Sequence, residues 1–246
     1  MKSDRLAIHP MSAVVGGVAA VLILGLASFR GGSAQSFGAG DEINELKEFL
    51  EHFSVVLLDD GQGHKVKTFR LSAVNLQIVS GLGATNGNPD DPQTNDPLLT
   101  RTNGRGNLIV GYNELKVPVI PNSVSNDRTG SHNIVVGKRN DYTSYGGLVA
   151  GDFNESGGPF ASVSGGNANR AVGIYASISG GFGGQAAGNW ASISGGHAGK
   201  ATGEYASVNG GRLNVAEGNY ASVGGGAFRS APGFDDWAAG GLFEDF

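Results

Sequence analysis

A fifteen-residue repeat in the second half of the chain limits the available folds more than any other feature. Residues 160–166 read FASVSGG, and closely similar segments begin at Tyr175, Trp190, Tyr205 and Tyr220. The residues between them keep the same register, with one alanine column (Ala171, Ala186, Ala201, Ala216, Ala231) and one glycine column (Gly173, Gly188, Gly203, Gly218, Gly233). Although 43 of the 246 residues are glycine, this register argues against a flexible glycine-rich linker.

Each repeat is too short for a helix pair, and its apolar residues lie in β-prone triplets such as 177–179 between glycines. We therefore predict an all-β fold, a parallel β-solenoid in which each coil has two short strands and glycine at the corners. Coils stacked at about 4.8 Å place like residues above like. The stack predicts a structural ladder (Val163, Ile178, Ile193, Val208, Val223) and an aromatic column (Phe160, Tyr175, Trp190, Tyr205, Tyr220).

The repeat begins earlier in a less regular form. Residues 107–111 read NLIVG, and 133–137 and 148–151 repeat this pattern. The glycines that end these segments, Gly111, Gly137, Gly151 and Gly166, are separated by 26, 14 and 15 residues. The wide first step indicates a coil with an insertion, roughly 113–128. We expect the solenoid to cover 104–232.

Coils of this size have a thin core, because each contributes one Val or Ile and a few alanines. Self-association would compensate for it. The aromatic column is then either a cap over each coil's own core or a contact with neighbouring chains. A ligand platform is the less favoured interpretation, since packing alone explains the aromatic spacing.

The N-terminus has the pattern of a secretory signal. Lys2, Arg5 and His9 precede an uncharged stretch, 10–29, with an apolar centre. Small residues at 32–34 favour cleavage before Gln35, while the length also permits an uncleaved membrane anchor of about 20 residues. We expect 1–34 to be a signal peptide or an N-terminal membrane anchor, with cleavage preferred.

Residues 35–80, between this segment and the repeats, are predicted to form a short helix and β structure. This part could align three chains as a trimerisation element. Asp41 is placed to cap a helix that ends near Phe53, and its apolar residues are spaced by three and four. Residues 55–58 and 66–71 flank a Gly- and Asp-rich turn and predict a hairpin, and 75–79 predict a further strand. Residues 81–103 have the composition of an exposed loop that separates two domains, and 233–246 form an acidic tail.

The unit Ala-x-Gly-x-Tyr-Ala-Ser-Val/Ile-x-Gly, seen at 201–210, resembles the head repeats of YadA-like trimeric autotransporter adhesins. The resemblance covers about 104–232. It implies a left-handed parallel β-roll, a homotrimer, and adhesion to a host, matrix or glycan surface by a protein at the cell surface of, or released from, a Gram-negative-type bacterium. The repeat here is fifteen residues where the family's unit is nearer fourteen, and the family's stalk and membrane anchor have no counterpart. We therefore expect the protein to be released, held by its N-terminal segment, or attached to a larger fibre or particle.

Catalytic and metal-binding patterns are weak, so we expect no enzyme activity, no cofactor and no metal site. The chain has no cysteine, and no Asp lies between Glu155 and Asp235, as a calcium-binding β-roll would need. The five histidines are scattered, and we expect His132 and His197 to be solvated turn residues. We expect Asp90, Asp91 and Asp96 to form a solvated loop rather than a cation site. A net charge of −5 without basic clusters after the N-terminus argues against a nucleic-acid partner.

The sequence therefore favours a structural or adhesive solenoid module, with specificity in the irregular segments 81–105 and 113–128. Two alternatives stay open. One is a carbohydrate-active β-solenoid enzyme, which would need acidic or basic groups in a groove. The other is an ice- or crystal-surface-binding protein, because Ser162, Ser177, Ser192, Ser207 and Ser222 would form a regular row of hydroxyls.

Overall fold

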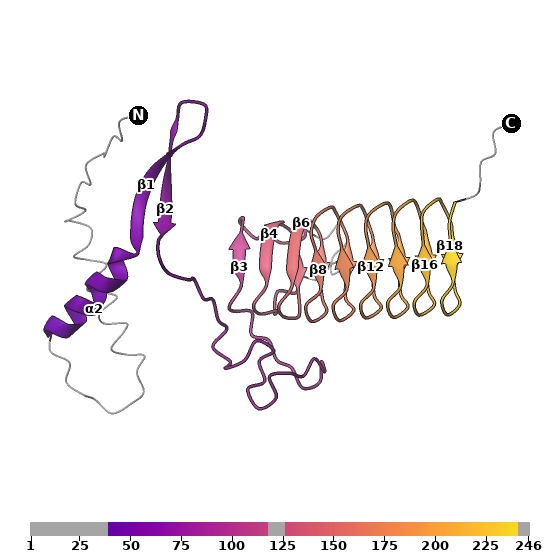
Figure 1. Ribbon diagram of the computed structural model, residues 1–246, viewed down its shortest axis with the longest axis horizontal. Helices are drawn as coiled ribbons and strands as arrows, with labels where there is room; N and C mark the ends of the chain where they lie inside the picture. Colours follow the sequence, from indigo (N-terminus) through magenta and orange to yellow (C-terminus); the bar gives the residue numbers. More distant parts are fainter. Residues whose placement is uncertain (1–38, 118–125, 241–246) are drawn as a thin grey trace. The chain divides into compact units, whose positions relative to one another are not determined.

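The computed structural model describes residues 39–117 and 126–240 (Figure 1). The chain divides into two compact units, 1–76 and 77–246. The expected signal peptide or anchor, 1–34, lies outside the described residues, as does the end of the acidic tail. In the described ranges, no helix has both the length and the apolar character needed to cross a membrane.

The first unit contains one helix and one hairpin. Helix α2 (Ala39–Glu51) is followed directly by β1 (Phe53–Asp59), which pairs antiparallel with β2 (Lys65–Leu71). The predicted hairpin is confirmed. The helix ends before Phe53, because that residue opens the strand ladder opposite Leu71 and its ring packs between Phe49 and Phe69. The predicted strand at 75–79 is wrong: after Ser72 N–H donates to the His52 carbonyl, the segment pairs with no strand among the described residues.

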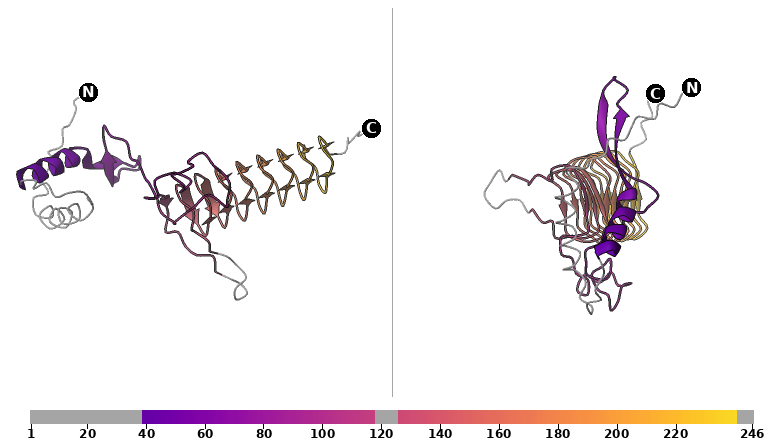
Figure 2. Two further views of the ribbon diagram at one scale, coloured as in Figure 1. Left: turned by 90° about the horizontal axis from the view of Figure 1, so that it is seen from below. Right: turned by 90° about the vertical axis from the view of Figure 1, so that its left-hand side faces the viewer.

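The second unit is the predicted parallel β-solenoid (Figures 1 and 2). The solenoid has two sheets, which we call sheet B and sheet D. Sheet B has nine strands: β3 (Leu108–Val110), β4 (Ile134–Lys138), β6 (Leu148–Asp152), β8 (Ser162–Val163), β10 (Ser177–Ile178), β12 (Ser192–Ile193), β14 (Ser207–Val208), β16 (Ser222–Val223) and β18 (Trp237–Ala238). Sheet D has seven strands: β5 (Asp141–Tyr142), β7 (Glu155–Ser156), β9 (Arg170–Ala171), β11 (Gln185–Ala186), β13 (Lys200–Ala201), β15 (Val215–Ala216) and β17 (Ser230–Ala231). The coils superpose in the view on the right of Figure 2.

The core is the narrow space between the two sheets. The five residues of the structural ladder lie in successive strands of sheet B in parallel register, and all are buried. They continue the column of Val135 and Val149 in the earlier coils. Alanines from sheet D and from the corners fill the other side. Most core positions are therefore Val, Ile or Ala, so each coil buries little apolar surface by itself.

The corners do not follow the expectation of glycine alone. All five members of the aromatic column have positive φ, as Tyr175 (58°) and Trp190 (55°) illustrate. This left-handed conformation is unfavourable for residues with a Cβ, so packing must hold the rings there. Glycine is obligatory at a different corner, because a Cβ on Gly188 would lie 1.9 Å from the Gly203 carbonyl oxygen.

A column of buried asparagines, the asparagine ladder, stabilises another corner. Its members are Asn140, Asn154, Asn169 and Asn214, each at most 1% exposed, with glycines at the two positions between Asn169 and Asn214. The side-chain oxygen of one asparagine accepts the backbone N–H of the equivalent residue in the next coil, at 2.8 Å from Asn154 to Asn169. The amide nitrogen donates to backbone carbonyls near the corner. The ladder thus satisfies buried backbone groups that strands this short leave unpaired.

The segment 81–103 is folded against the solenoid and belongs to the second unit, so it is not simply an exposed loop. Buried Asn86 donates to the carbonyls of Asp91 and Thr94, both at 2.9 Å. His132 is not a solvated turn residue, because its Nε2 accepts the Ser80 N–H at 2.9 Å and its Nδ1 lies 3.0 Å from the Thr85 carbonyl. It fixes this segment to the first coils.

Candidate binding surface

The outer face of sheet B changes its chemistry along the solenoid. The outward positions of β3, β4 and β6 are aliphatic, and the register places them in the same columns as serines of later coils. Leu108, Ile134 and Leu148, for example, precede Ser162 in one column. Because the inward residues stay Val or Ile from β3 to β16, this change concerns the surface and not the fold.

The aliphatic part, which we call the apolar block, consists of Leu108, Val110, Ile134, Val136 and Leu148. Four of these side chains are between 37% and 53% exposed, and Leu148 is partly buried. They lie side by side on neighbouring strands spaced by about 4.8 Å, so they form one continuous apolar surface. An exposed contiguous apolar surface on a rigid sheet is typical of a protein contact.

The later part, the serine block, consists of Ser162, Ser164, Ser177, Ser179, Ser192, Ser194, Ser207 and Ser222. These side chains are partly or fully exposed beside the buried ladder. The Ser207 hydroxyl donates to the Ser222 hydroxyl at 2.9 Å, so some hydroxyls bond to each other along the column. The serine block is therefore polar, regular and uncharged.

The aromatic column lies on an edge of the solenoid with each side chain 37–50% exposed. Neighbouring rings from Phe160 to Tyr220 stack with centroids 4.9–5.8 Å apart and interplanar angles of 7–17°. A sugar ring stacks on the face of an aromatic ring, but here neighbouring rings cover the faces of the interior members. Only ring edges are offered, which supports the interpretation of a packing column over that of a ligand platform.

A groove of about 480 Å³ lies between residues 97–102 and the coils. Its lining comprises Pro97, Thr100, Thr102, Thr143, Ser144, Gly157, Gly158, Pro159, Val172, Ile174 and Asn189. None of these lining residues carries a carboxylate or an imidazole, so the groove itself offers no group for general acid–base chemistry. Its hydroxyls and amide suit hydrogen bonding to a neutral polar ligand.

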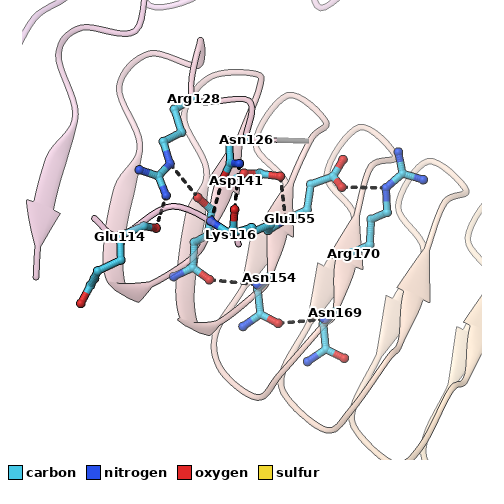
Figure 3. Close-up of polar contacts among 10 residues, drawn as sticks. Glu114, Lys116, Asn126, Arg128, Asp141, Asn154, Glu155, Asn169 and Arg170 are labelled. Carbon is cyan, nitrogen blue, oxygen red and sulfur yellow. Dashed lines mark hydrogen bonds and ion pairs between the residues drawn. The ribbon is translucent and has the colours of Figure 1, made fainter. Parts of the chain in front are cut away.

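Charged side chains gather where the insertion crosses β5 (Figure 3). The Lys116 Nζ lies 2.6 Å from Asp141 Oδ2, and both side chains are buried, 8% and 3% exposed. Burial raises the pKa of Asp141, against the hydrogen bond and charge of Lys116, which lower it. Arg139 pairs with Asp152 and, through this hydrogen bond, holds the pKa of Asp152 below its usual range. Arg128 donates from Nε to the Asn140 carbonyl at 3.3 Å.

The other polar residues considered from the sequence are not brought together. Asp91 and Asp96 contribute carbonyl groups to turns within 81–103, and His197 stacks on Phe182 with centroids 5.3 Å apart. Within 39–117 and 126–240, no three His, Asp or Glu side chains are arranged to hold a metal ion.

No family model matches the chain, and no curated protein matches its sequence. The geometry must therefore carry the functional argument. Sequence reasoning missed three features: the asparagine ladder, the apolar block and the buried Lys116–Asp141 pair. The asparagine ladder and the apolar block could have been found from the sequence, because their residues stand in aligned columns of the repeat. The Lys116–Asp141 pair could not, since 25 residues separate the partners and no pattern links them.

Proposed function

We propose that the chain is an exported structural and adhesive β-solenoid module that works as a homotrimer. The observation that carries this proposal is the apolar block on the outer face of β3, β4 and β6. A thin core gives each coil little stability, and a second copy of the chain on this surface would bury side chains that water now reaches. Three copies are what the resemblance to the YadA-like head repeats implies.

The hairpin of the first unit supports self-association independently. Val55, Leu57 and Phe69 lie on one face of the hairpin and are exposed, while Leu58 and Val66 are exposed on the other face. An isolated two-stranded hairpin is marginally stable in water, so one with apolar residues on both faces needs further packing. Equivalent hairpins of neighbouring chains can supply it without requiring any other protein.

Export and adhesion are further parts of the proposal. The basic residues and apolar stretch of the N-terminus support export. A rigid stack of coils with a neutral, hydrated outer face supports a display role, in which ligands bind to the irregular segments 81–105 and 113–128. Detection of the protein outside the cytoplasm after cell fractionation tests export, and binding of the purified protein to immobilised glycans and matrix proteins tests adhesion.

The absolute mass of the full chain in mild detergent, measured by light scattering over the micromolar range, tests the assembly. We expect three chains. A variant in which Leu108, Ile134 and Leu148 are replaced by serine carries the residue that Ser162 supplies in the same column. We expect it to dissociate while keeping its β circular dichroism. A monomeric wild-type protein, or a triple variant with unchanged mass, contradicts association through the apolar block.

The serine block favours one second candidate, binding to ice or another crystal surface. Its hydroxyls are regularly spaced along parallel strands, although the Ser207–Ser222 hydrogen bond engages two of them. Thermal hysteresis of the purified protein measures this activity directly. Activity that Ser177→Val and Ser192→Val abolish, without a change in mass, would favour this candidate over adhesion.

A further inference from the structure

We propose that Lys116 and Asp141 join in an intramolecular amide bond, a self-formed covalent cross-link between the insertion and the first strand of sheet D. This inference concerns a modification of the chain and does not depend on the proposed adhesive function. The two side chains already lie in contact, with Nζ 2.6 Å from Oδ2, and both are buried (Figure 3).

The backbone holds both partners in place before any reaction. Asn126 bonds to both sides of the Lys116 peptide: its Oδ1 accepts the Lys116 N–H at 2.6 Å, and its Nδ2 donates to the Lys116 carbonyl at 3.1 Å. Asp141 lies in β5, where its N–H donates to the Asn154 carbonyl at 2.8 Å. A nucleophile and an electrophile fixed at contact distance have a high effective concentration.

The surroundings disfavour the ion pair. Removing an ammonium and a carboxylate from water costs several kcal/mol for each ion, which the pair recovers only when all its hydrogen bonds are satisfied. Asp141 Oδ1 is buried and has no hydrogen-bond partner among the described residues. The Phe153 ring, whose centroid lies 4.7 Å from Nζ, shields the pair from water, although its face also attracts the ammonium. Burial also raises the pKa of Asp141, which favours the carboxylic acid over the carboxylate.

The reaction is a condensation that needs no other reactant. A proton passes from the ammonium of Lys116 to the carboxylate of Asp141, which leaves a neutral amine and a carboxylic acid. The amine lone pair attacks Cγ, a C–N bond forms, and one C–O bond breaks. The departing oxygen, which already carries the first proton, takes a second from the nitrogen and leaves as water, so the product is an amide without charge. Two buried charges are thereby removed from the site.

Glu155 is placed to carry the proton between the amine and the departing oxygen. It is the parallel partner of Asp141 on the adjacent strand, so the two side chains point to the same face of sheet D. Its charge acts on Asp141 and adds to the effect of burial on that pKa. Arg170 Nε donates to Glu155 Oε2 at 2.8 Å and orients this side chain on the face of sheet D that it shares with Asp141.

The cross-link would close a weak point of the fold. β5 is the edge strand of sheet D, with β7 on one side only. On its other side, the Tyr142 N–H donates to the Asp127 carbonyl at 3.0 Å and the Tyr142 carbonyl accepts the Gly130 N–H at 2.8 Å. The start of the insertion lies beside it, where the Arg139 N–H donates to the Glu114 carbonyl at 3.1 Å. A covalent bond at this edge would prevent the first coil from opening.

Peptide mapping of the full chain tests the proposal. The purified protein is denatured, digested with trypsin and analysed by tandem mass spectrometry. Acylated Lys116 resists trypsin, so we expect a branched peptide in which 106–128 is joined to 140–170 and lighter than their sum by one water molecule. Recovery of 106–116 and 140–170 only as separate, unmodified peptides from the wild-type protein would overturn the proposal.

Variants then assign the roles. Lys116→Arg keeps the positive charge and Asp141→Ala removes the electrophile, and neither is expected to yield the branched peptide. The exposed Lys138 provides the matched control, and Lys138→Arg is expected to retain the cross-link. Glu155→Gln preserves the shape of the side chain but not its basicity, so we expect cross-linking to slow by about a hundredfold. Unchanged cross-linking in Glu155→Gln would refute the proton transfer assigned to Glu155.

Discussion

The first coils, 108–156, and the regular coils, 157–240, share one interior and differ in almost everything outside it. Val135 and Val149 continue into the ladder of Val163 and its equivalents without a change of register. Outside, the first coils have an aliphatic surface, an insertion and a buried ion pair, whereas the regular coils present serines and an aromatic stack.

The difference teaches which positions the fold requires and which are free to serve binding. The alanine column and the glycines that contact the next coil keep their chemistry wherever the spacing is fifteen residues, and the ladder column from Val163 to Val223 stays Val or Ile. Outward positions vary with location along the stack. Function is therefore to be sought where outward chemistry departs from the repeat, which is in the first coils.

A steric clash between stacked regular coils is expected to have the largest effect on stability. Gly188→Ala places a Cβ 1.9 Å from the Gly203 carbonyl oxygen and 2.5 Å from its carbon, and the backbone of a stacked coil cannot move away cheaply. We expect the free energy of unfolding to fall by more than about 3 kcal/mol, measured by chemical denaturation and circular dichroism.

The matched control is Gly180→Ala in the same repeat. A Cβ at Gly180 meets no atom within 4 Å, so its replacement is expected to change stability by about 0.5 kcal/mol or less. Equal effects of the two substitutions would show that the coils do not stack as closely as described.

The asparagine ladder gives the second-largest effect. Asn154→Ala removes the acceptor of the Asn169 N–H and the donor to the Ala150 carbonyl, at 2.8 Å and 2.7 Å, inside a fully buried site. We expect a loss of about 1–3 kcal/mol in the free energy of unfolding. Asn209→Ala on the exposed outer face is the control and should change it little. An unchanged free energy of unfolding in Asn154→Ala would mean that water replaces the hydrogen bonds of the amide.

The sequence was sufficient to predict the solenoid, because a strict fifteen-residue period with β-prone triplets admits few alternatives. It also indicated the hairpin, through alternating residues around a turn rich in Asp and Gly. These predictions depend on local patterns that repeat or lie close together in the chain.

The remainder depended on contacts that no local pattern encodes. The segment 81–103 reads as a loop by composition, yet Asn86 and His132 tie it down through hydrogen bonds to distant backbone groups. The aromatic corners have a conformation that propensity assigns to glycine, and stacking across coils overrides it. The pair of Lys116 and Asp141 forms only because an insertion folds over an edge strand.

The aromatic corner gives a third, smaller effect on stability. Tyr205 has a φ of 58° and stacks at 4.9 Å on both Trp190 and Tyr220. Tyr205→Ala loses both contacts and keeps the unfavourable φ, while Tyr205→Gly loses the same contacts but accepts the φ, as Gly146 does in the first coils. We expect the Gly variant to be more stable than the Ala variant by about 1 kcal/mol in denaturant unfolding. The reverse order would contradict strain at this corner.

The smallest effect concerns the pH dependence of the first coils. The Arg139 hydrogen bond and charge lower the pKa of Asp152 in the folded protein. Stability from this pair is therefore present above the ordinary pKa of an aspartate and is lost as the pH falls through the lowered value. Asp152→Asn should reduce the melting temperature slightly at pH 7, and its difference from wild type should shrink on acidification. Glu217→Gln, at an exposed acid of the regular coils, controls for net charge. A constant difference across this pH range would mean that Asp152 stabilises the coil by packing and not by its charge.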